Sequence, residues 1–263
     1  MKLDISPEWL LAHSVNEPDQ FTPTQQEKQQ KLDIIGDCHG CYYELFDLLC
    51  KLGYVGNYHP EGRKIVFVGD LIDRGPYSIK CLQTAMRFIQ SGNGYMVMGN
   101  HDDKLKRYLI GNTITVNHGF ETTVQELSQL DEADPIDIKQ FLNSQPYCLY
   151  LDDCKLVVVH AAYMPVAVHP PTNKMNKAFK ARCIYGVVLA QNPLTGFPIR
   201  GDWSAKYKGD ATVVYGHTVQ PEVYVNNNTY GIDTGAVFGG KLTALRYPEM
   251  EIVQVKCKQY DTH

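Results

Sequence analysis

The stretch GDLIDRG, residues 69–75, directly follows the apolar run KIVFV, residues 64–68. That run has the length and composition of a buried strand, so the charged residues lie where the strand ends. Ligands of α/β folds bind at the carboxyl ends of strands, and Asp70, Asp73 and Arg74 therefore indicate a site for metal and phosphate. A loop ion pair between Asp73 and Arg74 is the alternative that this stretch alone leaves open.

Four other apolar runs end in the same kinds of residue. GDCHG at 36–40 follows the run 31–35, GNHD at 99–102 follows 95–98, His160 follows 155–159, and GHT at 216–218 follows 211–215. Five predicted strands thus carry Asp, Asn or His side chains at their ends. This recurrence favours one shared site over a chance match.

Composition limits the class of protein. The chain has 263 residues, of which 44% are hydrophobic, and its net charge is −4. These values are typical of one well-filled globular domain, and no broad basic field indicates nucleic-acid binding. Nowhere are there eighteen consecutive apolar residues, and residues 1–4 begin no apolar signal core. We expect a cytoplasmic protein that makes no membrane contact.

The eight cysteines are scattered along the chain. Cys38 and Cys41 have the C-x-x-C spacing of a zinc site, but the second such pair that a structural zinc site needs is missing. We therefore interpret them as two reduced thiols.

The order of predicted elements divides the chain. Residues 1–30 are expected to form a short helix and a polar arm, and residues 31–263 the main domain. In the first half, strands alternate with helical patterns, which favours parallel pairing. The main domain is expected to contain a helical insert at about 111–148, a long irregular connection at about 162–208, and short strands from residue 211 onward.

The donor types at the strand ends indicate the kind of metal. Carboxylate, imidazole and carboxamide groups without a thiolate suit divalent ions such as Mn²⁺, Fe²⁺ or Zn²⁺. Two such ions bridged by one carboxylate can clamp the attacking and leaving oxygens of a displacement at phosphorus. The pattern therefore favours phosphoryl chemistry at a pair of metal ions.

In this order and at these spacings, the five motifs resemble those of metallophosphoesterases of the phosphoprotein-phosphatase, or calcineurin-like, type. The resemblance covers residues 31–256 and implies an α/β fold, a sandwich of two mixed β-sheets flanked by helices. It also implies a hydrolase in which a water molecule bridging two metal ions cleaves phosphate ester or anhydride bonds.

The resemblance implies a role for each of ten residues. The expected metal ligands are Asp37, His39 and Asp70 for one ion and Asp70, Asn100, His160 and His217 for the other, with Asp70 bridging. Arg74 and Arg200 would bind the substrate phosphate, His101 would protonate the leaving oxygen, and Asp73 would orient His101. The expected cofactors are two divalent metal ions, Mn²⁺ first, with Fe, Zn and Mg as alternatives.

The substrate class is less sharply indicated. Residues 198–208 and 229–249 look closest to bacterial asymmetric diadenosine tetraphosphate hydrolases and to the phosphatase domain of bacterial polynucleotide kinase-phosphatases. The stretch 231–238 resembles the bacteriophage serine/threonine phosphatase. We expect nucleotide substrates such as dinucleoside tetraphosphates, with phosphoproteins and 2′,3′ RNA ends as alternatives. An inactive binding scaffold would lose ligands, whereas all six expected ligand positions are present.

Two positions have a second interpretation, and a third departs from the family pattern. Asn100 could cap the helix that follows it, and Asp233 could cap a turn instead of supporting the site. Asp102 stands where the eukaryotic protein phosphatases have Glu, which weakens the protein-phosphatase alternative.

Overall fold

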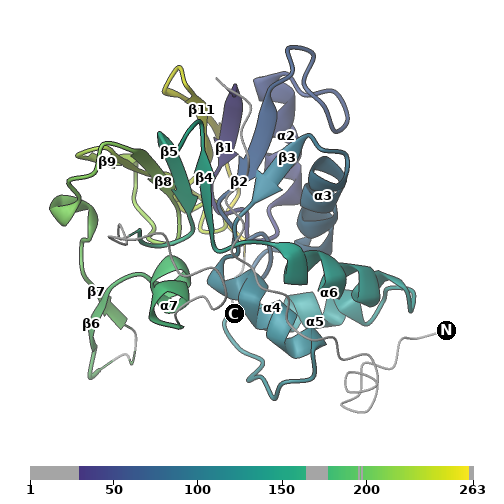
Figure 1. Ribbon diagram of the computed structural model, residues 1–263. Helices are drawn as coiled ribbons and strands as arrows, with labels where there is room; N and C mark the ends of the chain where they lie inside the picture. The colour runs from purple at the N-terminus through teal and green to yellow at the C-terminus, as the bar shows by residue number, and fades with distance from the viewer. Residues whose placement is uncertain (1–29, 164–176, 195, 197, 261–263) are drawn as a thin grey trace.

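The computed structural model describes residues 30–163, 177–194, 196 and 198–260, which form two facing β-sheets flanked by helices (Figure 1). The first sheet has the order β12 (Glu251–Lys256), β11 (Lys241–Tyr247), β1 (Leu32–Ile35), β2 (Lys64–Phe67), β3 (Gly94–Met96). The second has the order β4 (Cys148–Leu151), β5 (Leu156–Val159), β8 (Thr212–Tyr215), β10 (Thr229–Gly231), β9 (Tyr224–Asn226).

Both sheets are mixed, as the sequence predicted. In the first sheet β1, β2 and β3 pair in parallel, whereas β11 is antiparallel to β1 and to β12. In the second sheet β5, β8 and β10 pair in parallel, and β4 and β9 are antiparallel edge strands. The carboxyl ends of the parallel strands therefore lie together at one end of each sheet, which is where polar side chains can meet.

Apolar side chains from both sheets fill the space between them. In β1, Leu32 and Ile34 face the second sheet, where they join a cluster that includes Val158 and Val214. Ile35 points the other way and packs among side chains of the helical layer. Because successive side chains of a strand alternate between faces, one short apolar strand contributes to both layers of the core.

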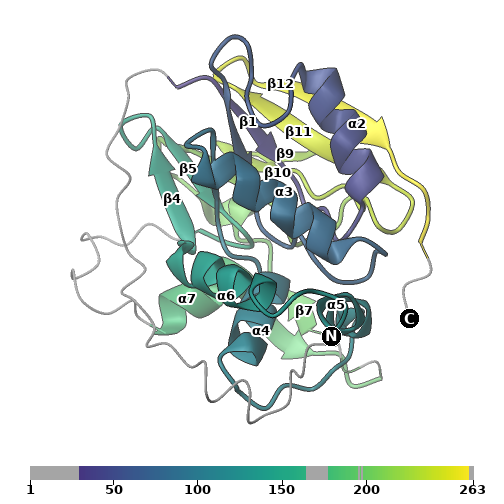
Figure 2. The same ribbon diagram turned by 90° about the vertical axis from the view of Figure 1, so that its right-hand side faces the viewer.

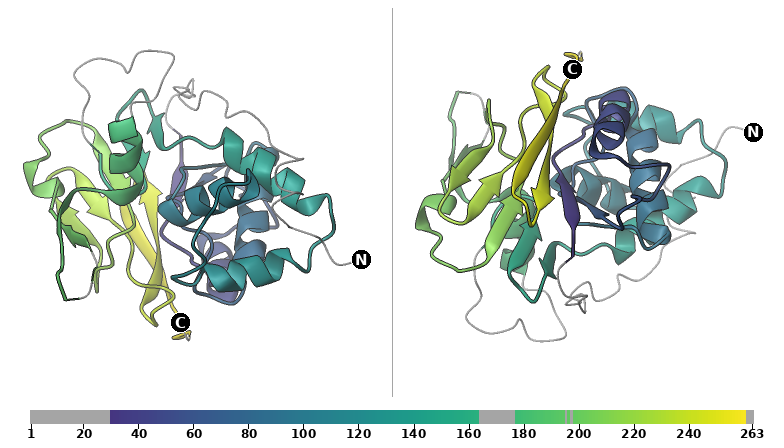
Figure 3. Two further views of the ribbon diagram at one scale, coloured as in Figure 1. Left: turned by 90° about the horizontal axis from the view of Figure 1, so that it is seen from below. Right: turned by 90° about the horizontal axis from the view of Figure 1, so that it is seen from above.

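Helices cover the outer face of the first sheet (Figures 2 and 3). α2 (Tyr42–Leu52) packs against β11 and β12, and α3 (Ser78–Gln90) packs against β3. These helices connect the parallel strands, as the alternating pattern predicted. At the carboxyl end of the strands lie α4 (Asn100–Leu109), α5 (Phe120–Leu127) and α6 (Asp134–Ser144), the last two within the predicted helical insert (Figure 1).

The prediction of an irregular connection at 162–208 is wrong for its described part. That part contains α7 (Lys177–Tyr185), the hairpin strands β6 (Val188–Gln191) and β7 (Pro198–Arg200), and a 3₁₀ turn, η1 (Ser204–Lys206). Every residue of β6 is exposed, so no apolar alternation marks it in the sequence. The predicted arm at 1–30 lies outside the described residues apart from Gln30.

Two features of the described chain concern membrane-spanning helices and disulfide bonds. None of its helices combines the length and the apolar character that crossing a bilayer requires. All eight cysteines are free, and Cys38 and Cys41 are buried, with their thiols directed at the backbone carbonyls of Gly36 and His39.

Candidate metal centre and its surroundings

The six expected metal ligands come together at the junction of the two sheets. Each lies within a few residues of the carboxyl end of a parallel strand: Asp37 and His39 after β1, Asp70 after β2, Asn100 after β3 at the start of α4, His160 after β5, and His217 after β8. Residues up to 180 positions apart in the sequence thus meet, as the hydrogen bond from the His217 main-chain N to Asp37 Oδ2 (2.9 Å) shows.

Asp70 lies at the centre of this arrangement. Its Oδ2 is 3.6 Å from Nε2 of His39 and 3.3 Å from Nε2 of His160. Two groups of possible metal donors contain it, one with His39 and His101 and one with His160 and His217, and within each group the donor atoms lie within 4.8 Å of one another. Burial alone would raise the pKa of Asp70, but the surrounding imidazoles, His160 foremost, hold it well below its usual range. Asp70 is therefore an anion shared by both groups.

Backbone carbonyls set the orientation of two imidazoles. Nδ1 of His39 lies 2.8 Å from the carbonyl oxygen of Ile72, and Nδ1 of His160 lies 3.0 Å from that of Val68. A carbonyl can only accept, so Nδ1 carries the proton in both rings. Nε2 of each ring is consequently the atom that faces Asp70, in the orientation that metal-binding histidines adopt.

Two buried polar atoms of the centre have no hydrogen-bond partner among the described residues, namely Oδ1 of Asp37 and Nε2 of His217. Burial raises the pKa of Asp37 well above its usual range, and the nearby carboxylate of Asp233 adds to the effect. Unpaired buried groups are rare in folded proteins and need a further ligand. Divalent cations meet this requirement, so the donor set fits the metal ions that the motifs imply.

Asn100 does not cap the helix that it begins. The N-cap of α4 is Gly99, and Oδ1 of Asn100 lies 3.3 Å from Nε2 of His160. The capping alternative is therefore not adopted. Instead, the amide oxygen is directed at the same space as the imidazole.

Asp102 fastens the loop after β2 to the start of α4. Its Oδ2 accepts hydrogen bonds from the main-chain N of Asp70 (2.7 Å) and of Gly99 (3.0 Å), and Oδ1 accepts one from Leu71 N (3.2 Å). Burial and the neighbouring Asp70 raise its pKa to about 7. Asp102, which stands where Glu occurs in the eukaryotic protein phosphatases, thus holds the main chain at Asp70 in place.

Two motif glycines permit the close approach of these carboxylates. A Cβ on Gly99 would lie 2.1 Å from Oδ1 of Asp70, and one on Gly216 would lie 1.9 Å from Oδ1 of Asp37. Any side chain at either position would displace the carboxylate. The glycines of GNHD and YGHT are therefore explained by packing against the centre.

The backbone of the centre is strained. Five of its non-glycine residues have positive φ: His39 (41°), Asp70 (49°), Asp73 (73°), Arg74 (70°) and His217 (69°). Such conformations cost free energy, and they cluster where a site needs side chains in fixed positions.

Arg74 and His101 lie beside the metal-donor groups. The Arg74 guanidinium contacts Nε2 of His39 through Nη1 and lies 3.1 Å from Nε2 of His101 through Nη2, while the ring of Phe238 lies 5.5 Å from it. Nδ1 of His101 lies 2.5 Å from Oδ2 of Asp73. The predicted phosphate-binding arginine, acid and orienting carboxylate are thus brought together.

Sequence reasoning missed how Asp73 is held. Thr123, on α5, donates from Oγ1 to Oδ1 of Asp73 (2.5 Å). The main-chain N of Asp73 donates to Oγ of Ser78 (2.9 Å). Glu126, one turn further along α5, accepts hydrogen bonds from the main-chain N of Ser78 (2.8 Å) and of Ile79 (3.1 Å). The helical insert is therefore part of the site, and no motif in it marks Thr123.

Arg200 and Asp233 lie at the edge of the metal centre. Arg200 ends β7 and donates to the carbonyl oxygen of Tyr185. The pKa of His217 is lowered mainly by burial, then by the charge of His160, and then by the charge of Arg200. Asp233 is buried, its pKa is raised by burial to about 6, and its Oδ1 accepts from Gly235 N (3.1 Å), so it supports a turn beside Asp37.

Known proteins resemble the chain in sequence and in fold. Residues 31–221 match the calcineurin-like phosphoesterase family. An asymmetrical bis(5′-nucleosyl)-tetraphosphatase PrpE of Anoxybacillus flavithermus is 46% identical, over 85% of this chain and 93% of its own length. The protein of that name from Halalkalibacterium halodurans is 41% identical, over 87% and 95%. The crystal structure of a putative diadenosine tetraphosphatase superposes with a TM-score of 0.63 at 23% identity, over 90% of this chain and 96% of its own, which shows the same fold.

Proposed function

The chain belongs to the calcineurin-like phosphoesterase family, and from this we propose that it is a metal-dependent hydrolase of nucleotide phosphoanhydrides, with dinucleoside tetraphosphates as its preferred substrates. The observation that carries the proposal is the position of Asp70, which is shared by two groups of metal donors and accepts a hydrogen bond from the main-chain N of His101, whose ring lies beside Arg74. Relatives that are 40–46% identical over most of their length bear the name bis(5′-nucleosyl)-tetraphosphatase.

The family implies divalent metal ions, and we propose that the preferred ion is Mn²⁺. One ion would be held by Asp37, His39 and Asp70, and the other by Asp70, Asn100, His160 and His217. When bound, such a pair supplies Lewis acidity, which neutralises phosphoryl charge and makes water acidic enough to ionise near neutral pH. Hard oxygen donors mixed with imidazoles suit Mn²⁺ better than a soft metal.

The chain's own residues would position the phosphate and move the proton. Arg74 presents two N–H groups to the phosphoryl oxygens, a task for which its fork of donors is suited. As water forms its bond to phosphorus and the bond to the leaving oxygen breaks, Nε2 of protonated His101 gives its proton to that oxygen. Asp73 accepts from Nδ1 of His101 and stabilises the imidazolium.

A cytoplasmic location is part of the proposal. Nucleotide substrates occur there, and the free state of all eight cysteines fits a reducing compartment.

The function can be tested with a panel of substrates. The Mn²⁺-loaded protein would be given diadenosine tetraphosphate, a ribonucleoside 2′,3′-cyclic phosphate and a phosphoserine peptide. We expect kcat/KM for the tetraphosphate to exceed the others by at least about a hundredfold. A preference for the peptide or the cyclic phosphate would contradict the proposed substrate class. Activity on none of the three would contradict the proposal that the protein is a phosphohydrolase.

A further inference from the structure

A cavity of about 280 Å³ opens beside the metal centre. Two of its lining residues connect it to that centre. Thr218 directly follows His217, and Arg200 approaches Ala161, the residue after His160, because a Cβ on Gly186 would lie 4.0 Å from Nη1 of Arg200 and 3.7 Å from Cβ of Ala161. The lining residues are Arg200, Gly201, Asp202, Trp203, Tyr215, Thr218, Gln220, Tyr224 and Gly231. A ligand in this cavity would therefore extend from the reacting phosphate.

The aromatic wall of the cavity is held in place. The Trp203 indole Nε1–H donates to the carbonyl oxygen of Ala161 (3.0 Å), and Ala161 directly follows His160. The edge of the Tyr215 ring meets the indole with ring centroids 5.0 Å apart. Trp203 is only half-buried, so a planar group can reach the part of its surface that lines the cavity. A fixed aromatic plane next to a phosphate site is suited to stacking a nucleobase.

The polar groups of the cavity complement a nucleoside. Within the described chain, the side chains of Thr218 and Gln220 make no hydrogen bond, so both remain able to bind a ribose or the edge of a base. Asp202, in contrast, is already engaged: its Oδ2 accepts from the Tyr224 hydroxyl (2.9 Å), and its Oδ1 accepts from Ser204. Asp202 therefore shapes the wall, and Arg200 lines it with a positive charge.

We propose that this cavity binds the nucleoside of the substrate, with its base stacked on Trp203 and its polar edges bound by Thr218 and Gln220. The inference rests on the proposed nucleotide function and adds the residues that recognise the base. Pockets for drug-sized ligands span about 300–1,000 Å³. The cavity, at about 280 Å³, lies just below this range, so it suits one nucleoside, while the remaining phosphates and the second nucleoside stay outside.

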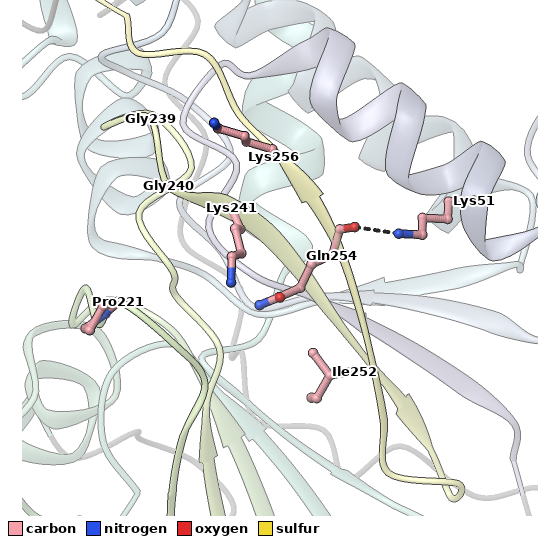
Figure 4. Close-up of a pocket in the computed structure, with 8 residues that line it drawn as sticks. All are labelled: Lys51, Pro221, Gly239, Gly240, Lys241, Ile252, Gln254 and Lys256. Carbon is pink, nitrogen blue, oxygen red and sulfur yellow. Dashed lines mark hydrogen bonds between the residues drawn. The ribbon is translucent and has the colours of Figure 1, made fainter.

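Two other cavities fit the nucleoside less well. One of about 640 Å³ lies by β11 and β12 and has no aromatic lining residue (Figure 4). Its Lys51 already bonds the carbonyl oxygen of Gln254 (2.9 Å), and its Lys241 already pairs with Glu222 (2.6 Å). The other, of about 470 Å³, is also lined by Trp203 but contains neither Arg200 nor Thr218, so it does not connect to the centre through them.

Fluorescence tests the stacking directly, because the sequence has only two tryptophans, Trp9 and Trp203. In the Mn²⁺-loaded Trp9→Phe variant, all tryptophan emission comes from Trp203. Adenosine 5′-monophosphate should quench this emission in a saturable manner, whereas ribose 5-phosphate, which has the same phosphate but no base, should leave it within about 10% of its starting value. Equal responses to the two compounds, or none to either, would overturn the proposal.

Kinetics test the residues. Trp203→Ala should lower kcat/KM for diadenosine tetraphosphate by at least about fivefold, since stacking on one aromatic ring contributes that much or more. Activity on p-nitrophenyl phosphate, which has no base, should change less than about twofold. Gln220→Ala should show the same selectivity to a smaller extent. The matched control is Leu189→Ala, since Leu189 lines the 470 Å³ cavity and not the 280 Å³ one, and the rates on both substrates should stay unaffected.

The outcomes separate the nucleoside site from the proposed function. If wild-type protein hydrolyses diadenosine tetraphosphate and Trp203→Ala changes both substrates equally, the nucleoside site is overturned and the function stands. A selective loss in Leu189→Ala would also overturn it, because the base would then lie on the other side of Trp203. If wild-type protein hydrolyses only p-nitrophenyl phosphate, the proposed function fails. Base-specific quenching of Trp203 would then still support the nucleoside site.

Discussion

The hydroxyl of Thr123 lies 2.5 Å from Oδ1 of Asp73, fifty residues earlier in the chain. The other oxygen of the same carboxylate, Oδ2, lies 2.5 Å from Nδ1 of His101. A helix of the insert thus fixes the carboxylate that orients the proposed acid. The insert is therefore expected to influence catalysis as well as to cover the site.

Thr123→Val tests this connection, because it keeps the shape of the side chain but removes the donor to Asp73. A carboxylate that loses a hydrogen bond can rotate, so we expect kcat to fall by about tenfold with KM little changed. Thr122→Val is the matched control, since the Thr122 hydroxyl bonds the carbonyl oxygen of Gly119, the N-cap residue of α5, and among the described residues makes no hydrogen bond to Asp73. Similar losses in both variants would show that the helix is merely destabilised.

His101→Asn should affect substrates according to their leaving groups. A leaving oxygen needs a proton only in so far as its anion is unstable, so the variant should lose about 10²–10⁴ in kcat on a nucleoside monophosphate. Nitrophenyl phosphate and phosphoanhydrides, whose leaving groups are better, should lose much less. Parallel rate measurements on the three substrates check this. Equal losses, with metal content unchanged, would mean that His101 is not the acid.

Arg74→Lys should impair every substrate by at least about tenfold although the charge is kept. An ammonium group cannot present two parallel donors to a phosphoryl group as the guanidinium can. The control is Arg87→Lys on α3, an exposed arginine that should tolerate the same exchange. If the loss in Arg74→Lys were confined to one substrate class, Arg74 would be a specificity residue.

Arg63→Met should lower the free energy of unfolding by about 3 kcal/mol, because the buried Arg63 guanidinium bonds Asp33 (3.1 Å) and Glu249 (2.9 Å). Hydrogen bonds from Arg63 lower the pKa of Glu249 to about 2 from an ordinary value of 4.5. The Glu249 contribution is therefore complete above pH 4.5 and is lost as the pH falls through about 2.

Urea unfolding at constant metal concentration measures the effect. Lys31→Met is the control, since Lys31 and Glu61 form an exposed pair 3.4 Å apart, and such pairs contribute little. Equal stability of the two variants would contradict the buried role of Arg63.

Much of the centre could be predicted because its signals are local. Each expected ligand lies within a few residues of an apolar strand, so the pattern of a strand followed by Asp, Asn or His marks it. The supporting contacts could not be predicted in this way. Thr123 approaches Asp73 only through the packing of α5, and Trp203 meets Ala161 across 42 residues. The exposed hairpin of β6 and β7 lacks the apolar alternation by which a strand is recognised.

The central claim is that Asp70 joins two metal ions in one centre, and the metal content of Asp70→Asn tests it most directly. Wild-type protein loaded with Mn²⁺ and freed of excess metal should retain two ions per chain by elemental analysis. Loss of the shared anion should leave one ion or none in the variant and remove activity more completely than His39→Asn or His217→Asn, which alter the ligands of one ion each. Two ions per chain in Asp70→Asn, with activity near that of the wild type, would contradict the shared centre.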